Sequence, residues 1–388
     1  MSAPVTSRAG RMPAIRPVCW LAVWLVCLLA AGPALAKRSP GNRAGGGDER
    51  AASMGTAWLA APEEDLDRLV VTDLAGLGDR STGSAGCRLT ADALAAFFQG
   101  LGAGEVGRLA YQLPVIRYAP AFLAIAGRED RLPLSPLALN ALTPDAVPAK
   151  GLTGRLVAAG HGDYRNFNGT APKGGIALLD LDSGRNWQAA AQLGAKALIY
   201  VDERPAENPA DRGLFADKFE LTPVRFPRFL VAAEALRAFL GDAPVLDGSG
   251  QAPLAELHGG AHWETALAED VHILFPGTDP ALAGQILVVD APYDATALVP
   301  GRAPGADEAA SVAALVRLAR QLAAHPPARP VMLVAVSGHA QAQAGLREYF
   351  AALRAKGKDL RSQARAVREE RRSIEATLAG LEIGRAHV

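Results

Sequence analysis

The segment Ile286–Ser311, ILVVDAPYDATALVPGRAPGADEAAS, joins a short apolar run to an acidic loop and the start of a helix. The apolar run ends at Val289 and is followed by Asp290, a pattern typical of a strand buried on both faces. Apolar residues at helical spacing predict a helix from Ala306 to about Ala324. This order indicates an open α/β sheet, in which sites form at the carboxyl ends of the strands.

The loop and the first turn of the predicted helix are rich in carboxylates, namely Asp290, Asp294, Asp307 and Glu308. Gly305 gives the backbone conformational freedom just before the helix. Carboxylates clustered at such an edge usually ligate a metal ion or remain from an earlier metal site. The loop is therefore the first place to look for function.

The same alternation continues on both sides of this segment. Val271–Phe275 and Val331–Val336 have the apolar composition of strands, and a helix is predicted from Gly345 to about Ala355. Strands that alternate with helices predict an α/β fold, with a mostly parallel sheet sandwiched by helices.

Between residues 131 and 262 the apolar runs become short, and proline and glycine become frequent. This texture predicts a compact β-rich insert with peripheral helices. The expected strands are 174–180, 195–201 and 229–232, and the expected helices are 187–194 and 233–240.

The N-terminal residues 1–36 have the pattern of a secretory signal. Three arginines precede an apolar core from about Val18 to Ala31, and Ala34-Leu35-Ala36 fits the small-x-small cleavage rule. An uncleaved anchor is the alternative, but the apolar core is short for a full span. We expect export to the periplasm, the cell envelope or the exterior. Residues 37–62 are rich in glycine, arginine and alanine and predict a flexible linker.

Composition excludes several classes of function. The formal net charge is +0, so no global basic character favours nucleic acid as a partner. Of the 3 cysteines, only Cys87 lies outside the signal, which excludes an internal disulfide and a cysteine-rich zinc site. The sequence contains no Walker loop and no GxSxG nucleophile elbow.

The C-terminal part changes character again. Residues 356–382 are highly charged, which is typical of a solvated helix. The last six residues, IGRAHV (383–388), match one translated frame of a common sequencing adapter. We therefore expect the natural chain to continue beyond about Leu381, and its missing part leaves membrane association open.

Several of these segments together resemble the zinc aminopeptidases of peptidase family M twenty-eight that carry an inserted protease-associated (PA) domain. The resemblance runs from about Glu63 to Phe350. It assigns residues 63–130 and 263–355 to a peptidase-like α/β core and residues 131–262 to a PA-like insert. The segments that carry it are GDRSTGSAG (78–86), GGIALLD (174–180), WQAAAQLGAKALIYVDE (187–203), VHILFPGTDPALAGQILVVDAPYDA (271–295), PGADEAASVAALVRLAR (304–320) and VMLVAVSGHAQAQAGLREYF (331–350).

The resemblance implies a site for two zinc ions, held by histidines and carboxylates, with a glutamate as general base on a bridging water. Asp307 stands at the position of the bridging aspartate, but Pro292 replaces the first histidine ligand. Asp294 stands where the family has the aspartate that orients this histidine, so it would have nothing to orient. His339 replaces the general base, and Ala340 replaces the glutamate ligand beside it.

These replacements predict an exported, aminopeptidase-like protein that binds peptide or protein through a degenerate, non-catalytic zinc site. Zinc binding would be weakened or lost. The alternative is an active zinc-dependent aminopeptidase with altered ligands, in which His339 acts as base or ligand and forms a single-metal site with Asp294, Asp307 and Glu308.

Other histidines are weaker metal candidates. His258 and His262 are separated by two glycines, which argues against a shared helical face. The pattern His161-Gly162-Asp163 lies in the predicted insert and is more typical of a loop.

Overall fold

The structure is a computed structural model, which describes residues 46–140, 147–167, 172–204, 224–241 and 253–355, with Thr143, Lys218 and a few single residues between 362 and 373. The predicted signal (1–36), the adapter-like segment (383–388) and most of the charged segment 356–382 lie outside the described residues.

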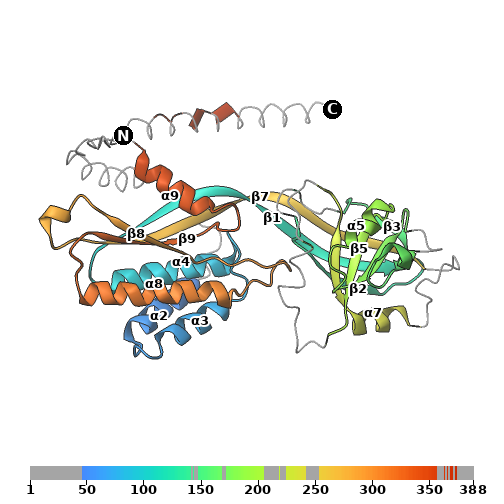
Figure 1. Cartoon of the computed structure of the whole chain (residues 1–388), viewed down its shortest axis with the longest axis horizontal. Helices are drawn as coiled ribbons and strands as arrows, with labels where there is room; N and C mark the ends of the chain where they lie inside the picture. The colour runs from blue at the N-terminus through green and yellow to red at the C-terminus, as the bar shows by residue number, and fades with distance from the viewer. Residues whose placement is uncertain are drawn as a thin grey trace, which may run out of the picture.

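Two long strands run through the whole molecule and join its two lobes (Figure 1). Strand β1 (Glu105–Ile125) pairs antiparallel with β7 (Leu254–Phe275), with partners from Glu105 and Leu274 at one end to Ile125 and Ala255 at the other. Together with the shorter strands they form a 9-stranded sheet in the order β1-β2-β6-β5-β4-β3-β7-β9-β8, with β1 also paired to β7.

The first lobe carries the acidic loop. Strands β8 (Leu287–Pro292) and β9 (Val331–Val336) pair in parallel, and β9 pairs antiparallel with β7. In Figure 1 four helices lie on one face of this part of the sheet and α9 (Ala344–Arg354) lies on the other. The four are α2 (Gly46–Ala60), α3 (Leu66–Ala75), α4 (Ala85–Gly100) and α8 (Ala306–Ala324).

The predicted α/β class is confirmed, with two differences of detail. The sheet is mixed rather than mostly parallel, because the long β1–β7 pairing is antiparallel. Strand β8 is not buried on both faces, since only Ala291 in it is buried and Leu287 is 51% exposed. Its one strand partner among the described residues is β9.

The second lobe contains the short elements of the predicted insert. A parallel set of β3 (Leu152–Ala158), β4 (Ile176–Asp180), β5 (Ala197–Asp202) and β6 (Arg228–Ala232) forms its centre. Around it lie β2 (Arg131–Pro136), α5 (Trp187–Gln192) and α7 (Ala233–Leu240). The lobe extends beyond residues 131–262 in one respect, since Ala121 and Leu123 of β1 belong to its apolar core.

Much of the segment predicted as a flexible linker, residues 37–62, is helical. Helix α2 spans Gly46–Ala60 within it. Its buried residues Ala51, Met54 and Trp58 recur at helical spacing. The Trp58 ring packs edge-on against Phe97 with centroids 6.3 Å apart, and its Nε1 donates to Asp73 Oδ2 at 2.8 Å. The many small residues of α2 hide this apolar stripe in the sequence.

We expect Trp58→Ala to lower the free energy of unfolding by about 3–5 kcal/mol, because it removes a large buried ring from a packed helix interface. Urea unfolding followed by far-ultraviolet circular dichroism measures the change. The control is Trp263→Ala, whose side chain is 49% exposed and should matter little. Equal effects of the two substitutions would show that α2 is not packed as described.

Candidate functional site

The loop between β8 and α8 is folded around one buried guanidinium. Arg80 has no exposed surface and donates to the carbonyl oxygens of Tyr293 (2.7 Å), Pro304 (2.9 Å) and Gly305 (2.6 Å). Burial lowers the pKa of Arg80, and the negative charge of nearby Glu308 opposes this shift. An arginine nevertheless remains protonated in proteins. The loop is therefore wrapped around a permanent positive charge.

Gly305 is required at the end of this loop. Its φ of +60° lies in the left-handed region, and a Cβ there would stand 2.3 Å from Ala295 Cβ and 2.8 Å from Arg80 Nη2. Only glycine avoids both the backbone strain and the overlap. The freedom predicted for Gly305 therefore has a specific cause, the close approach of the arginine that organises the loop.

Asp294 is the centre of the site. It is wholly buried, its Oδ2 accepts from Thr82 Oγ1 at 2.6 Å and from the Gly338 N–H at 2.8 Å, and its Oδ1 lies 2.6 Å from His339 Nδ1. The expectation that Asp294 has nothing to orient is therefore wrong. A histidine from the end of β9 is its partner, and the carboxylate favours the tautomer in which Nδ1 carries the proton.

The turn that carries His339 is conformationally unusual. Ala342 and Gln343 both have positive φ values, 53° and 54°, although neither is glycine. Such strain persists only where the surroundings enforce it. Here Ala344 N–H donates to Gly338 O at 2.9 Å, and Gln341 Oε1 lies 2.9 Å from the Thr82 hydroxyl. A hydrogen bond within the turn and a contact from the Thr82 segment thus hold it in place.

The other predicted residues stand on the elements that flank the loop. Pro292 ends β8, whereas Asp307 and Glu308 stand in the first turn of α8, with Asp307 exposed and Glu308 half-buried. Over the ranges that the structure describes, the one group of three or more potential ligands whose atoms come within 4.8 Å of one another is His161, Asp180 and Asp182, in the second lobe.

Of the alternative single-metal set, Asp294 and His339 lie together, but the four residues do not form a group within 4.8 Å in the described part of the chain. One physical reason is that both oxygens of Asp294 already accept hydrogen bonds from protein donors. The donor set at this edge does not fit a two-zinc centre, since Pro292 and Ala340 offer no side-chain ligand atom.

A second carboxylate near the site was missed in the sequence. Asp270 on β7 is wholly buried, and its Oδ1 accepts from the Ser337 N–H at 3.0 Å, while its Oδ2 has no hydrogen-bond partner. The hydroxyl of Tyr111 lies 3.5 Å from Oδ1 and donates to Ser337 O at 2.9 Å. Burial raises the pKa of Asp270 to about 7. The only sequence signal was a carboxylate directly before an apolar run.

Comparison with solved structures identifies the fold. Two crystal structures of BSAP, a zinc aminopeptidase from Bacillus subtilis, match with TM-scores of 0.54 and 0.52 at 22% sequence identity, covering 75% of this chain. The chain spans 65% of the length of that enzyme. An aminopeptidase from Aneurinibacillus sp. strain AM-1 matches with a TM-score of 0.45 at 19% identity, over 81% of this chain and 70% of that one.

The chain therefore has a zinc-aminopeptidase-like fold, as the resemblance implies. No protein-family model and no curated protein matches the sequence. Within the described residues, no helix has the length and apolar character that a bilayer span needs.

We expect Arg80→Met to lower the free energy of unfolding by about 3 kcal/mol or more, because three buried carbonyl oxygens would lose their donor. Urea unfolding measures the loss. Arg88→Met is the matched control, since Arg88 is exposed and makes one bond, to Gly83 O at 2.9 Å. If both variants were equally stable, Arg80 would not organise the loop.

Asp270 should make stability depend on pH. A folded-state pKa of about 7 against an ordinary value of 3.8 means that the folded chain holds the proton more tightly, so stability falls as pH rises from about 4 to about 7. We expect Asp270→Asn to raise stability at pH 8 by about 1–3 kcal/mol and to flatten this slope. Urea unfolding at several pH values tests both effects, with Asp290→Asn as the exposed control. An unchanged slope in Asp270→Asn would contradict the assignment.

Proposed function

We propose that this protein is an exported, peptidase-like protein that binds a peptide or protein segment and has lost the two-zinc chemistry of related enzymes. The single observation that carries this proposal is that protein hydrogen bonds occupy both carboxylate oxygens of Asp294. Its carboxylate is wholly buried and is hydrogen-bonded to Thr82, Gly338 and His339. The neighbouring Pro292 has no atom that could ligate a metal.

The chemistry of the residues supports binding rather than hydrolysis. Zinc, when bound in such a fold, polarises a carbonyl group and lowers the pKa of a bound water. The donor set at this edge does not fit that ion. Asp294 fixes the ring of His339, which leaves a positioned imidazole. A positioned general base alone supplies only part of the rate enhancement that peptide hydrolysis needs. The sequence offers no nucleophile elbow to replace the metal.

The second candidate is an active zinc-dependent aminopeptidase with altered ligands. Two observations favour it, namely the zinc-aminopeptidase-like fold and the Asp294–His339 pair, which resembles the carboxylate–histidine pairs that position a general base. Asp307 would then be a ligand and His339 the base. Export rests on the signal-like residues 1–36.

The test uses the mature chain and its Asp307→Ala and His339→Ala variants. We expect no release of p-nitroaniline from a panel of aminoacyl-p-nitroanilides, and mass spectrometry should show that incubated peptides stay intact. Fluorescence anisotropy with labelled peptide pools should detect binding that is weaker in His339→Ala, because this side chain lies at the site. In equilibrium dialysis against micromolar zinc, Asp307→Ala should retain as much zinc as the unmodified chain.

Hydrolysis that is lost in Asp307→Ala, together with loss of bound zinc, would overturn the proposal and establish the second candidate. Failure of every peptide pool to bind would refute the binding role. Thermal unfolding of each variant provides the control for folding.

A further inference from the structure

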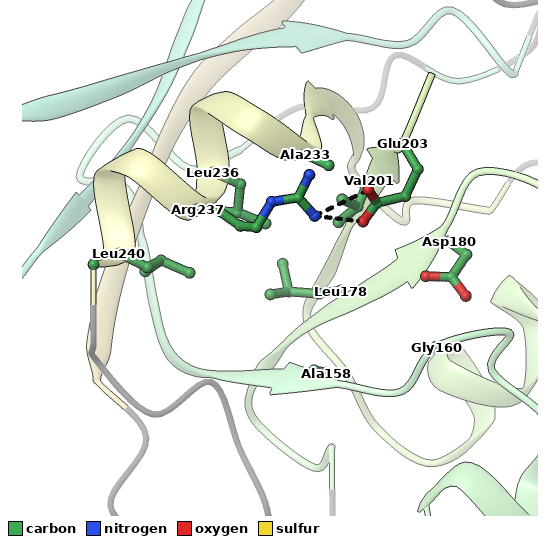
Figure 2. Close-up of a pocket in the computed structure, with 11 residues that line it drawn as sticks. Ala158, Gly160, Leu178, Asp180, Val201, Glu203, Ala233, Leu236, Arg237 and Leu240 are labelled. Carbon is green, nitrogen blue, oxygen red and sulfur yellow. Dashed lines mark hydrogen bonds and ion pairs between the residues drawn. The ribbon is translucent and has the colours of Figure 1, made fainter. Parts of the chain in front are cut away.

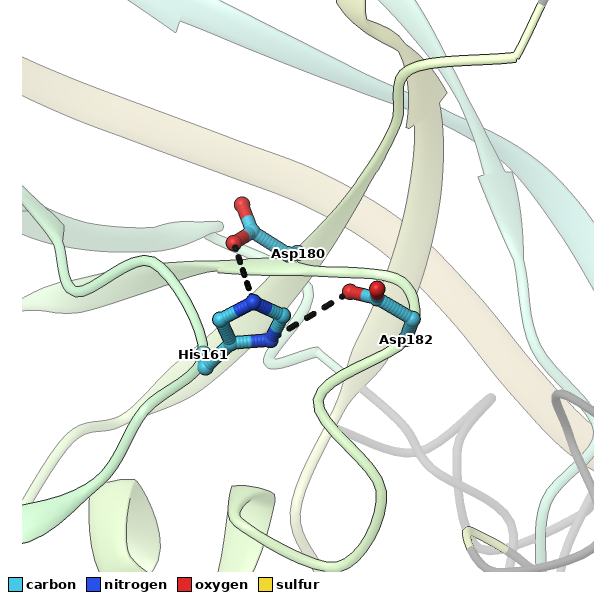
Figure 3. Close-up of side chains that lie close together, drawn as sticks. All are labelled: His161, Asp180 and Asp182. Atoms are coloured by element: carbon cyan, nitrogen blue, oxygen red, sulfur yellow. Dashed lines mark ion pairs between the residues drawn. The ribbon is translucent and has the colours of Figure 1, made fainter.

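Three potential metal ligands meet in the second lobe, away from the site at β8. His161 follows β3, Asp180 is the last residue of β4, and Asp182 lies in the turn after β4. His161 Nδ1 is 3.4 Å from Asp182 Oδ1, and His161 Nε2 is 4.0 Å from Asp180 Oδ2. Figure 3 shows the imidazole between the two carboxylates. The pattern His161-Gly162-Asp163 predicted only a loop, whereas the fold places His161 beside Asp180 and Asp182.

One backbone and one side-chain hydrogen bond tie the His161 loop to the residues at and after the end of β4. Asp180 N–H donates to Gly160 O at 2.9 Å, and Asn186 Nδ2 donates to His161 O at 2.8 Å. Gly160 and Gly162 flank the histidine with positive φ values of 48° and 73°, which lets the loop turn back toward β4. The backbone positions of the histidine and the aspartates are therefore fixed by these contacts.

A cavity of about 230 Å³ adjoins the group, and Asp180 is one of its lining residues. Figure 2 draws Asp180 and Leu240 at opposite ends of the lining set, with the Glu203–Arg237 ion pair between them. The rest of the lining is largely apolar and comes from the ends of β3, β4 and β5 and from α7. The cavity thus lies at the carboxyl ends of parallel strands, the edge where α/β sheets bind ligands.

We propose that His161, Asp180 and Asp182 bind one divalent first-row transition-metal ion, such as Zn²⁺, at the mouth of this cavity. One imidazole and two carboxylates suit such an ion better than Mg²⁺ or Ca²⁺, which take oxygen ligands. The ligand atoms lie within 4.8 Å of one another. The two ring nitrogens of His161 face different aspartates, Nδ1 toward Asp182 and Nε2 toward Asp180. Ligands with bonds of ~2 Å stand ~3.3 Å apart in a tetrahedron, so the side chains must rotate until one ring nitrogen and both carboxylates face the ion. Water completes the coordination.

The competing explanation is a surface ion pair between protonated His161 and the two aspartates, which contributes little. The two explanations differ in their pH dependence. Metal binding needs a neutral imidazole and competes with protons, so it weakens at lower pH. The ion pair needs the protonated ring, so it weakens at higher pH.

The experiment is isothermal titration of ZnCl₂ into the mature, untagged chain after removal of metals by chelation, at pH 6 and at pH 7.5. We expect one ion per chain, with a Kd below ~100 μM at pH 7.5 and binding at least ~5-fold weaker at pH 6. His161→Gln and Asp182→Asn should each weaken binding by ~10-fold or more. His325→Gln, an exposed histidine at the end of α8, should leave it unchanged.

A Kd weaker than ~1 mM, or an equal titration in His161→Gln, would refute the site. Zinc lost in Asp307→Ala but kept in His161→Gln would instead place the metal at the first lobe, which refutes this inference and the loss of zinc in the proposed function together. Zinc lost in His161→Gln and kept in Asp307→Ala supports both. Cobalt substitution gives a second readout, since the visible d–d bands should disappear in Asp182→Asn.

Discussion

The buried guanidinium of Arg80 is the interaction on which the arrangement of the first lobe depends. Three carbonyl oxygens of a long loop are satisfied by a single side chain from a distant segment. A buried loop that lacked such donors would carry a large cost in unsatisfied polar groups. The arginine therefore fixes the path from β8 to α8, and that path sets the position of Asp294.

Asp294 in turn holds the turn after β9 through hydrogen bonds. Its carboxylate accepts from Gly338 and faces His339, so the strained residues Ala342 and Gln343 are held between this anchor and the start of α9. Asp294 thereby fixes the orientation of the His339 ring.

The sequence predicts the short, strongly patterned elements well. The helix Ala306–Ala324 and the strand Val331–Val336 lie within the residues expected for them, because their apolar spacing is regular. Strands β1 and β7 were harder to recognise. Their solvated middle sections, including Trp263 at 49% exposure, interrupt the apolar pattern by which strands are recognised. Helix α2 was hidden by its small residues.

The site was less predictable than the fold. The sequence identified Asp294, Asp307 and His339 as important positions and grouped them as metal ligands in one alternative. It did not predict the direct Asp294–His339 contact, because contacts between loops separated by a helix depend on tertiary structure. The group His161, Asp180 and Asp182 was missed for the same reason. Its members are scattered over two loops, and only the parallel pairing of β3 with β4 brings them together.

The continuity of β1 and β7 has a mechanical consequence. Two continuous strands joined by many hydrogen bonds resist stretching and shear. The lobes therefore cannot separate unless the β1–β7 pairing breaks. Bending is easier where the register shifts, between Ala119 and Phe122. A movement of one lobe relative to the other would therefore be accommodated at this register shift.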